Sequence, residues 1–303
     1  MAAMPNPQSM SLYTVFLRVA RDSSFTAAAR TLGYTQSAVS RQIQTLEDEW
    51  GVPLFDRLPR GVRLTEAGRV LLPHAEAVEA RLATARAEIE ALRTLAAGRL
   101  RIGAFATADA QLLPSALAAF RARHPGVRVT RAEGLSAGLL QLLTAGELDL
   151  AVVTAPEGAP DGVELHHLLD ERMYVALPRS HPLAGRTDVR LAELADEEWI
   201  AGSTRPEQTL MRTAVADGFR PRPGFVVAEW IAKQGFVAAG LGVTLVPALA
   251  ACAARPDLAL VALHPDDAPW RAVYAATPRG PAPTPAVAAF LALLRQAAGR
   301  LAS

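Results

Sequence analysis

The chain has 303 residues, of which half are hydrophobic and a fifth are charged, and its formal net charge at pH 7 is +1. This length suggests two or three folded units, and the hydrophobic content predicts a sizeable packed core. A net charge this small excludes any argument for a nucleic-acid partner from bulk charge, so such an argument needs a local surface.

The N-terminal segment and the cysteine content indicate the compartment. Residues 1–10 have neither the basic start nor the apolar stretch of a signal peptide. No uninterrupted apolar run approaches the roughly 20 residues that span a bilayer. The single cysteine, Cys252, rules out an intramolecular disulfide, and because it lies among alanines we expect it to be buried. We therefore expect a soluble, cytoplasmic protein.

Three helices are predicted in the first part of the chain. In the first, apolar residues recur with the spacing of one helix face, at Leu12, Val15, Phe16, Val19 and Ala20. A serine, Ser23 or Ser24, can cap a second helix over 25–32. Thr35 can cap a third helix that ends near Trp50. Two helices joined by so short a turn are typical of a helix-turn-helix.

The third predicted helix has one apolar side and one polar side. Its apolar side is expected to face the core and consists of Val39, Ile43, Leu46 and Trp50. Its other side presents amide, hydroxyl and guanidinium groups on Gln36, Ser37, Ser40, Arg41 and Gln44. These groups suit base edges and phosphates, whereas an ordinary solvated helix face usually mixes lysine and glutamate along its length. The acids Glu47, Asp48 and Glu49 lie at the far end, so the pattern favours contact with the major groove of DNA.

A short basic hairpin is predicted directly after this helix. Two extended runs within residues 52–65 flank a turn at Pro59-Arg60-Gly61. Three arginines project from the hairpin: Arg57, Arg60 and Arg63. A basic hairpin beside a recognition helix can act as a wing that holds phosphates or enters a minor groove.

A run of 45 residues from Ser24 to Gly68 has a specific pattern, made up of Ser24–Ala29, Thr35–Ile43, Leu46-Glu47, Gly51–Arg57 and Leu64–Gly68. This run closely resembles the signature of LysR-type transcription regulators. The resemblance implies that Gln36, Ser37, Ser40 and Arg41 meet the major groove, and that Thr26, Arg57 and Thr65 meet the DNA backbone. It also implies a homodimer on duplex DNA, with a tetramer as a further assembly.

A long helix with a heptad pattern is predicted after the hairpin. Thr65 can cap it, and its apolar residues are spaced alternately by four and three positions. The pattern predicts a dimerisation seam, although a helix lying on its own domain would also have one apolar side. Pro73 lies within the pattern and is expected to kink the helix. Seam contacts are expected from Leu71, Val78, Leu82, Ile89 and Leu92, and Ala75, Ala85 and Ala96 occupy the remaining positions of the same pattern.

Strands alternate with helices after Gly98, which implies an α/β fold with a parallel sheet and crossover helices. Strands are expected at 99–105, 127–133, 148–153, 173–177, 199–201, 225–227, 243–246 and 271–276, and helices at 112–124, 136–146, 206–217, 230–239 and from 285 onward. The resemblance implies that this region is the effector domain of the LysR family, which is built like a periplasmic binding protein.

The expected domain organisation follows from these elements. A winged helix-turn-helix domain (1–65) and a linker helix (66–97) precede an effector-binding domain (98–303). Within the effector-binding domain we expect two α/β lobes, the first from 99–168 and 270–303 and the second from 169–269.

Ligands of open α/β sheets bind outside the carboxyl ends of the strands, beside helix N-termini. The residues expected there are Phe105, Thr107, Ser136, Gly202, Ser203 and Trp230. The alternative is structural: the hydroxyl residues can be helix caps, and Trp230 can be packing at the hinge. If Phe105 and Trp230 do contact the ligand, a partly apolar or aromatic effector is favoured.

Other functions lack their sequence signals. The adjacent His166 and His167 would point to opposite faces of a strand and make a poor metal site. No phosphate-binding loop and no GxSxG motif is present, so neither an enzyme nor a cofactor is expected. Two alternatives stay open: a two-lobed solute-binding or enzyme-like protein whose head has another purpose, and a DNA-binding head on an unrelated C-terminal domain.

Overall fold

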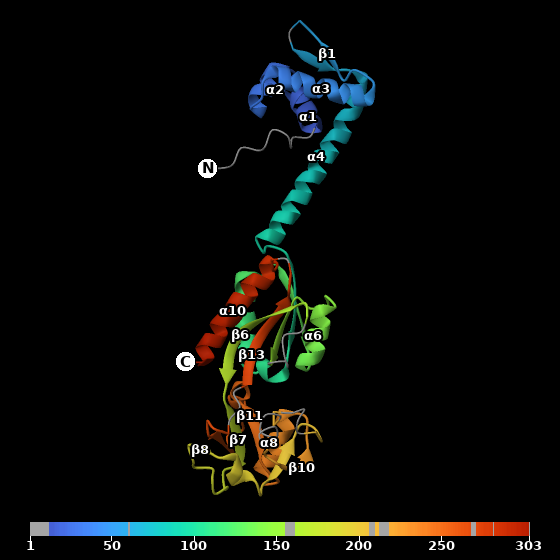
Figure 1. The fold of residues 1–303 in the computed structure, drawn as a ribbon. Helices are drawn as coiled ribbons and strands as arrows, with labels where there is room; N and C mark the ends of the chain where they lie inside the picture. The colour runs from blue at the N-terminus through green and yellow to red at the C-terminus, as the bar shows by residue number, and fades with distance from the viewer. Residues whose placement is uncertain are drawn as a thin grey trace. The chain divides into compact units, whose positions relative to one another are not determined.

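The computed structural model describes residues 12–59, 61–154, 161–205, 210–211, 218–267, 271–280 and 282–302 (Figure 1). The chain forms two compact units, residues 1–91 and 92–303. Two sequence predictions fall outside the described residues: the position of Arg60 in the hairpin, and most of the helix expected over 206–217.

The first unit contains the predicted helices, the hairpin and most of a long helix. The elements are α1 (Leu12–Asp22), α2 (Phe25–Leu32), α3 (Gln36–Trp50), β1 (Phe55–Arg57), β2 (Val62–Leu64) and α4 (Glu66–Arg93). The side-chain oxygen of Ser24 accepts a hydrogen bond from the backbone N–H of Ala27, and Thr35 does the same for Ala38, each at 3.2 Å. These N-caps satisfy backbone donors that a helix start leaves unpaired, so they fix where α2 and α3 begin.

The core of the first unit is built around the apolar side of α3. Val39, Ile43 and Leu46 are buried there together with residues of α1, α2 and the hairpin. The Glu47 carboxylate accepts hydrogen bonds from the backbone N–H groups of Leu54 at 2.7 Å and Phe55 at 3.2 Å. This acid at the far end of α3 therefore attaches the first strand of the hairpin to the helix.

Two expectations about buried residues in this unit are wrong. Trp50 is 53% exposed, because it ends α3 one turn beyond Leu46, the last residue of the helix that reaches the core. Leu71 is only 6% exposed and packs, with Ala75, in the core of the first unit. Leu71 is therefore unavailable to a dimerisation seam, and the exposed part of the heptad pattern starts at Val78. The helix α4 continues through Pro73.

The second unit contains a five-stranded sheet in the order β4-β3-β5-β13-β6. Its strands are β3 (Gly98–Ala104), β4 (Val127–Glu133), β5 (Leu150–Thr154), β6 (Val163–Glu171) and β13 (Arg271–Pro278). Strand β3 runs parallel to β4 and β5, whereas β13 is antiparallel to β5 and β6.

Helices cover both faces of this sheet. They are α5 (Leu112–Arg123) and α10 (Pro285–Ala302) on one face and α6 (Ser136–Thr144) on the other (Figure 1). Consecutive strand residues show this arrangement: Val152 packs in the cluster with α5 and α10, and Val153 packs in the cluster with α6. The rings of Phe120 and Phe290 meet edge to face at 5.5 Å between α5 and α10.

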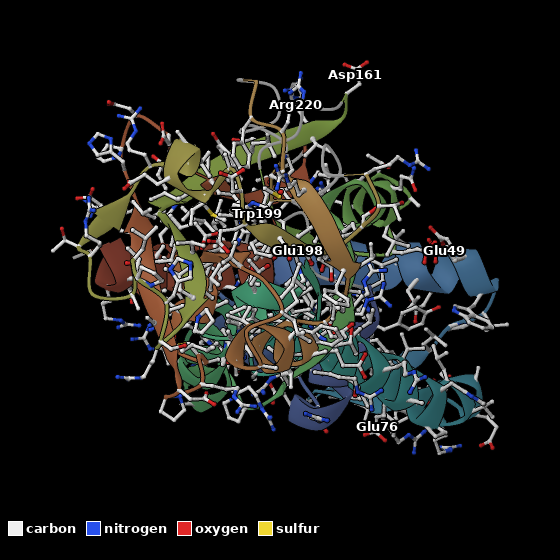
Figure 2. The ribbon with its side chains drawn as sticks, turned by 90° about the horizontal axis from the view of Figure 1, so that it is seen from below. Glu49, Glu76, Asp161, Glu198, Trp199 and Arg220 are labelled. Atoms are coloured by element: carbon white, nitrogen blue, oxygen red, sulfur yellow. The ribbon has the colours of Figure 1, made fainter. Side chains whose placement is uncertain are left out.

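A four-stranded sheet in the order β11-β7-β12-β8 forms the other part of this unit. Its elements are β7 (Met173–Pro178), β8 (Asp188–Val189), β11 (Thr244–Pro247) and β12 (Leu258–Leu263), beside the parallel pair β9 (Glu198–Ala201) and β10 (Arg222–Val226) and the helices α8 (Trp230–Ala238) and α9 (Ala248–Ala251). Trp199 is fully buried here and is labelled next to the exposed Glu198 in Figure 2. The predicted fold class, a winged helix-turn-helix, a long helix and an α/β effector domain, is confirmed, but both sheets are mixed and not parallel as expected, because β13, β11 and β7 enter them antiparallel to their neighbours.

Gly68 supplies a test of the packing between α4 and the hairpin. A Cβ built on Gly68 would lie 2.2 Å from the backbone oxygen of Leu54, a contact that only a backbone shift can relieve. We expect Gly68→Ala to destabilise the first unit by about 1–3 kcal/mol. Hydrogen exchange read by mass spectrometry on peptides from 12–59 measures this loss.

A matched control is Gly138→Ala on α6, where the added Cβ would meet nothing within 4 Å. We expect that change to leave exchange in 12–59 unaltered, and unaltered exchange in the Gly68→Ala protein would contradict the packing described.

Candidate DNA interface and effector site

The polar side of α3 is exposed because its other side is anchored in the core. Gln36, Ser37, Arg41 and Gln44 are exposed, and Ser40 is half-buried. Gln44 donates to the Asp48 carboxylate at 2.9 Å, and the hydroxyls of Thr35 and Ser37 lie 3.0 Å apart. The described residues provide no ion pair for Arg41. Amide, hydroxyl and guanidinium groups thus face outward together.

The base of the hairpin adds Arg57 to this surface. Its guanidinium donates to the Ser40 hydroxyl at 3.4 Å and lies 5.6 Å from the centre of the Phe25 ring. Arg63 is opposite Asp56 in the hairpin register and forms an ion pair with it at 3.2 Å. Arg57 is therefore joined to the polar side of α3, whereas the charge of Arg63 is partly balanced within the hairpin.

The two threonines expected near the DNA backbone have different surroundings. Thr26 is exposed in the first turn of α2. The Thr65 hydroxyl donates to the Pro53 carbonyl at 2.8 Å and accepts from the Gly68 N–H at 3.0 Å. Its only proton is thus used within the fold, so Thr65 serves as the cap predicted for α4 and has no hydroxyl proton left for a phosphate.

Phe105 and Thr107 surround an arginine that the sequence analysis did not single out. Phe105 is 7% exposed and lies in the core beside the short helix η2 (Ala106–Asp109). The Arg271 guanidinium lies 4.9 Å from the centre of the Phe105 ring and donates to the Thr107 hydroxyl at 2.8 Å. The Thr107 hydroxyl is therefore partnered by a cation rather than serving as a helix cap.

Arg271 also forms a buried ion pair with Glu171. Its Nε donates to the Glu171 carboxylate at 2.5 Å, and that carboxylate accepts from the Leu249 N–H of α9 at 3.0 Å. Burial raises the pKa of Glu171 and lowers the pKa of Arg271, while their mutual attraction acts against both shifts. These bonds join η2 and the adjacent strands β6 and β13 to α9, the helix that directly follows β11 of the four-stranded sheet.

Ser136 is bound within its own part of the fold. Its hydroxyl accepts from the backbone N–H of Thr154 at 3.0 Å and lies 3.0 Å from the Thr154 hydroxyl. Leu135 occupies the cap position of α6, so Ser136 is not the cap. The contact holds the start of α6 against the carboxyl end of β5, where the sequence analysis expected ligand.

Gly202, Ser203 and Trp230 lie around the carboxyl end of β9. Ser203 accepts a hydrogen bond from the Arg205 N–H at 3.2 Å. The indole nitrogen of Trp230, the first residue of α8, is buried and has no hydrogen-bond partner among the described residues. The Lys233 ammonium lies 3.4 Å from the position that a Cβ on Gly202 would occupy. Lys233 is not among the residues that the sequence predicted to contact an effector.

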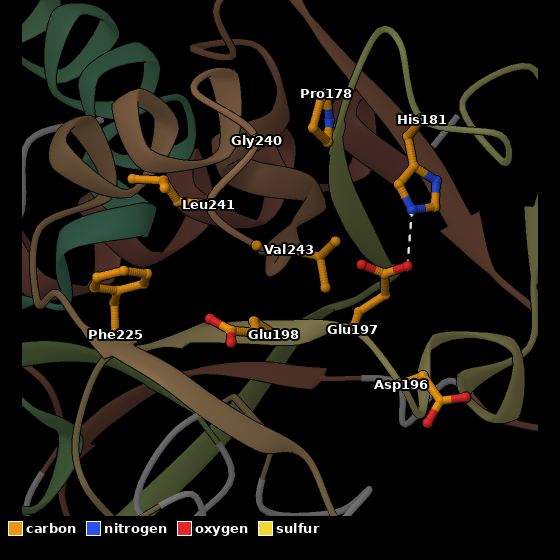
Figure 3. Close-up of a pocket in the computed structure, with 10 residues that line it drawn as sticks. Pro178, His181, Asp196, Glu197, Glu198, Phe225, Gly240, Leu241 and Val243 are labelled. Atoms are coloured by element: carbon orange, nitrogen blue, oxygen red, sulfur yellow. Dashed lines mark hydrogen bonds and ion pairs between the residues drawn. The ribbon is translucent and has the colours of Figure 1, made fainter.

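A cavity of about 350 Å³ lies at the opposite end of β9 (Figure 3). Acidic side chains from Asp196 to Glu198 line one part of it, and Phe225 and Leu241 line another. His181 bonds to Glu197 at 3.1 Å across its edge. None of the residues expected to contact an effector lines this cavity, so the two features are separate.

Three other expectations concern a metal site, a membrane-spanning helix and the burial of Cys252. Within the described residues, no group of three or more His, Cys, Asp and Glu side chains could hold a metal ion. None of the described helices has the length and apolar character needed to cross a membrane. The expectation that Cys252 is buried is wrong, because this thiol is exposed at the end of α9.

Comparison with known proteins identifies both parts of the chain. Residues 10–69 match the family described as "Bacterial regulatory helix-turn-helix protein, lysR family", and residues 93–299 match the family described as "LysR substrate binding domain". This chain belongs to the LysR family of transcription regulators. It is a DNA-binding regulator with an effector-binding domain, and not an enzyme. The match over 93–299 also excludes an unrelated C-terminal domain.

Relatives of this LysR regulator extend over nearly the whole chain. The "RuBisCO operon transcriptional regulator" of Allochromatium vinosum is 32% identical over 301 residues and covers 97% of both chains. The "HTH-type transcriptional regulator BudR" of Raoultella terrigena is 35% identical over 262 residues, which are 82% of this chain and 87% of BudR.

Solved structures of LysR regulators have the same fold. The structure of full-length CbnR complexed with its target DNA has 25% identity and a TM-score of 0.65, and the match covers 95% of this chain and all of CbnR. The oxidized form of OxyR from Corynebacterium glutamicum has 27% identity and a TM-score of 0.73, with 98% of this chain and 95% of that protein covered.

The ion pair between Glu171 and Arg271 predicts a large effect of breaking it. Arg271→Met leaves a buried carboxylate without its cation, which we expect to lower the unfolding free energy of this LysR regulator by about 3–5 kcal/mol. Urea unfolding followed by tryptophan fluorescence measures the change.

Two further variants make this result specific. We expect Glu171→Met combined with Arg271→Met to recover most of the loss, because no unpaired charge is then buried. Arg279→Met removes an exposed arginine from the same region and serves as the control. A loss in the Arg271→Met protein no greater than that of the control would show that the pair does not stabilise the fold.

Proposed function

We propose that this LysR regulator recognises its operator through the outward side of α3, with the hairpin as a wing on the neighbouring phosphates. The residues proposed to contact base edges or adjacent phosphates are Gln36, Ser37, Ser40, Arg41 and Gln44, and those proposed for the DNA backbone are Thr26, Arg57, Arg60 and Arg63. One observation supports this most strongly: the exposed part of α3 from Gln36 to Gln44 has no acid and is joined to Arg57 at Ser40.

The chemistry of these side chains suits duplex DNA. Glutamine offers a donor and an acceptor that fit the edge of adenine, and arginine offers two parallel donors that fit guanine. Serine hydroxyls and Arg57 fit phosphate oxygens. CbnR, a similar protein, has been solved with its target DNA, which supports the same mode here. Thr65 is the weakest member of the set carried over by resemblance, because its proton is donated to Pro53.

We also propose that α4 pairs two copies of the chain. Val78, Leu82, Ile89 and Leu92 are each at least 40% exposed, although all four are large and apolar and recur with heptad spacing. Burying them against a second α4 would remove this apolar surface from water. Two heads in one dimer could then read two half-sites. By analogy with the family, two such dimers could assemble into a tetramer through a further contact.

For the second unit we propose a response to a small-molecule effector bound near the carboxyl ends of the strands. Phe105, Thr107 and Ser136 belong to the part with the five-stranded sheet, and Gly202, Ser203 and Trp230 belong to the part with the four-stranded sheet. The bond from Arg271 to Thr107 and the bond from Glu171 to α9 link the two sides. An effector that alters the position of Thr107 would therefore act on Arg271, Glu171 and, through them, on α9, which follows β11 of the four-stranded sheet.

Alanine substitution of the α3 surface tests the proposed reading. We expect Arg41→Ala and Gln36→Ala each to weaken binding to operator DNA by roughly 5- to 150-fold, the effect of losing one well-placed base contact. Gel-shift titration with an operator selected from random duplexes measures this. Folding should stay intact, because both side chains are exposed.

The control for charge is Arg128→Ala, which removes an exposed arginine from β4 in the second unit. Its operator affinity should equal that of the unaltered protein. An Arg41→Ala protein that binds as tightly as this control would refute the assignment of α3.

A charge on the exposed side of α4 tests the proposed dimer. We expect Leu82→Lys or Ile89→Lys to convert dimers into monomers in light scattering, because a buried unpaired lysine is costly in an apolar seam. Ala87→Lys, on the opposite side of the same helix, should leave the mass unchanged. Equal masses for all three variants would eliminate the seam.

A further inference from the structure

The chain contains a single lysine, Lys233, among its 31 lysine and arginine residues. It lies in the first half of α8 and is half-buried. Burial lowers its pKa, and the charge of Glu229 one turn earlier opposes this shift only in part. No described residue makes an ion pair or a hydrogen bond with its ammonium group. A partly desolvated cation without an acceptor is costly, so its position calls for an explanation.

Two chain segments meet at this lysine. Strands β9 and β10 are parallel, Gly202 directly follows β9, and α8 follows β10, so the start of α8 lies at the same sheet edge as Gly202. A Cβ on Gly202 would lie 3.4 Å from the Lys233 ammonium. The ammonium group is therefore directed across the glycine at the carboxyl end of β9, where open α/β sheets bind ligands.

A second donor without a partner lies one turn away on the same helix. The Trp230 indole N–H is buried and has no acceptor among the described residues. Residues three positions apart share one side of a helix, so the indole and the ammonium group belong to one surface. Both groups can only donate hydrogen bonds. A ligand that satisfies them has to supply acceptors, and one that balances the ammonium has to carry negative charge.

Two arginines of this unit that are at least partly shielded from water already have such partners. The Arg101 guanidinium forms two hydrogen bonds to the Asp149 carboxylate, at 2.6 and 3.2 Å, and the Arg271 guanidinium is bonded to Glu171. Both pairs are structural. Lys233 differs because no carboxylate of the described residues is bonded to it, and its ammonium is a compact charge with three donors that can turn toward a single oxyanion.

We propose that Lys233 binds an anionic group of the effector, a carboxylate or a phosphate, at the carboxyl end of β9, with the Trp230 indole N–H as a second donor. This proposal rests on the proposed effector-binding function in one respect, which is that the bound anion is the effector. The absence of a side chain at Gly202 leaves room for the anion beside the ammonium group.

The single lysine allows a direct test. Protein grown with [ε-13C]lysine has one labelled side chain, so its NMR resonance reports on Lys233 alone. The probes are sodium benzoate, inorganic phosphate, the uncharged benzamide, and sodium chloride at matched ionic strength. We expect benzoate or phosphate to shift the resonance in a saturable way and benzamide and chloride to leave it in place. A response to benzoate alone indicates a carboxylate, and a response to phosphate alone indicates a phosphate.

Two variants separate binding from a structural role. We expect Lys233→Met to lower the affinity for the effective anion by at least roughly tenfold in thermal-shift titrations. Its melting temperature without anion should be unchanged or higher, because a desolvated charge is removed. Lys233→Arg keeps the charge and should retain part of the binding, whereas Arg279→Met is the control for loss of an exposed cation.

Two results would overturn the proposal. One is a Lys233 resonance that responds equally to benzoate, phosphate, benzamide and chloride. The other is a Lys233→Met protein that anions stabilise as much as the unaltered chain. Operator binding by Lys233→Met without anion should equal that of the unaltered protein. A saturable shift of the Lys233 resonance by an anion that leaves operator binding of the unaltered protein unchanged would instead count against the proposed effector function.

Discussion

The burial of one side of α3 is the constraint on which the DNA-reading part of this protein depends. Val39, Ile43 and Leu46 are almost completely removed from water, and each such side chain contributes about 1.5–3 kcal/mol to stability. A helix fixed along three positions on one side cannot rotate, so Arg41 and its polar neighbours must face outward. The same burial positions the hairpin, because Glu47 at the end of α3 binds the backbone of Leu54 and Phe55.

The second unit contains two kinds of polar group shielded from water: a mutually bonded ion pair, and hydrogen-bond donors without an acceptor among the described residues. Glu171 and Arg271 neutralise each other and link the five-stranded sheet to α9, so removing either leaves an uncompensated charge in the interior. Lys233 and the indole of Trp230 are donors whose acceptors the described chain does not supply. The first arrangement stabilises the fold whether or not a ligand is present. The second is complete only when an anion is bound, which is how a sensor can distinguish its free and occupied states.

Features fixed by neighbouring residues could be predicted from the sequence, whereas features fixed by distant ones could not. The caps at Ser24 and Thr35 and the apolar side of α3 through Leu46 depend on residues within a turn or two, and these were predicted correctly. The heptad spacing through Leu71 did not reveal that the first three turns of α4 still belong to the core of the first unit. Strand β12 (Leu258–Leu263) was missed, because a short apolar run does not by itself distinguish a strand from a helix.

Arg271 and Glu171 are 100 positions apart, so nothing local indicates their pairing, and Lys233 has no signal beyond being the only lysine.

The most direct test of the central claim is the position of the outward side of α3 on bound DNA. With Cys252 replaced by serine, Ser37→Cys provides one thiol to which iron-EDTA can be attached on that side. Hydroxyl radicals from the complex should cut operator DNA at two sites, one in each half-site. The same reagent on Glu88→Cys, an exposed position of α4, should give a different and weaker pattern. Cutting from Ser37→Cys no stronger or more localised than from Glu88→Cys would contradict the account.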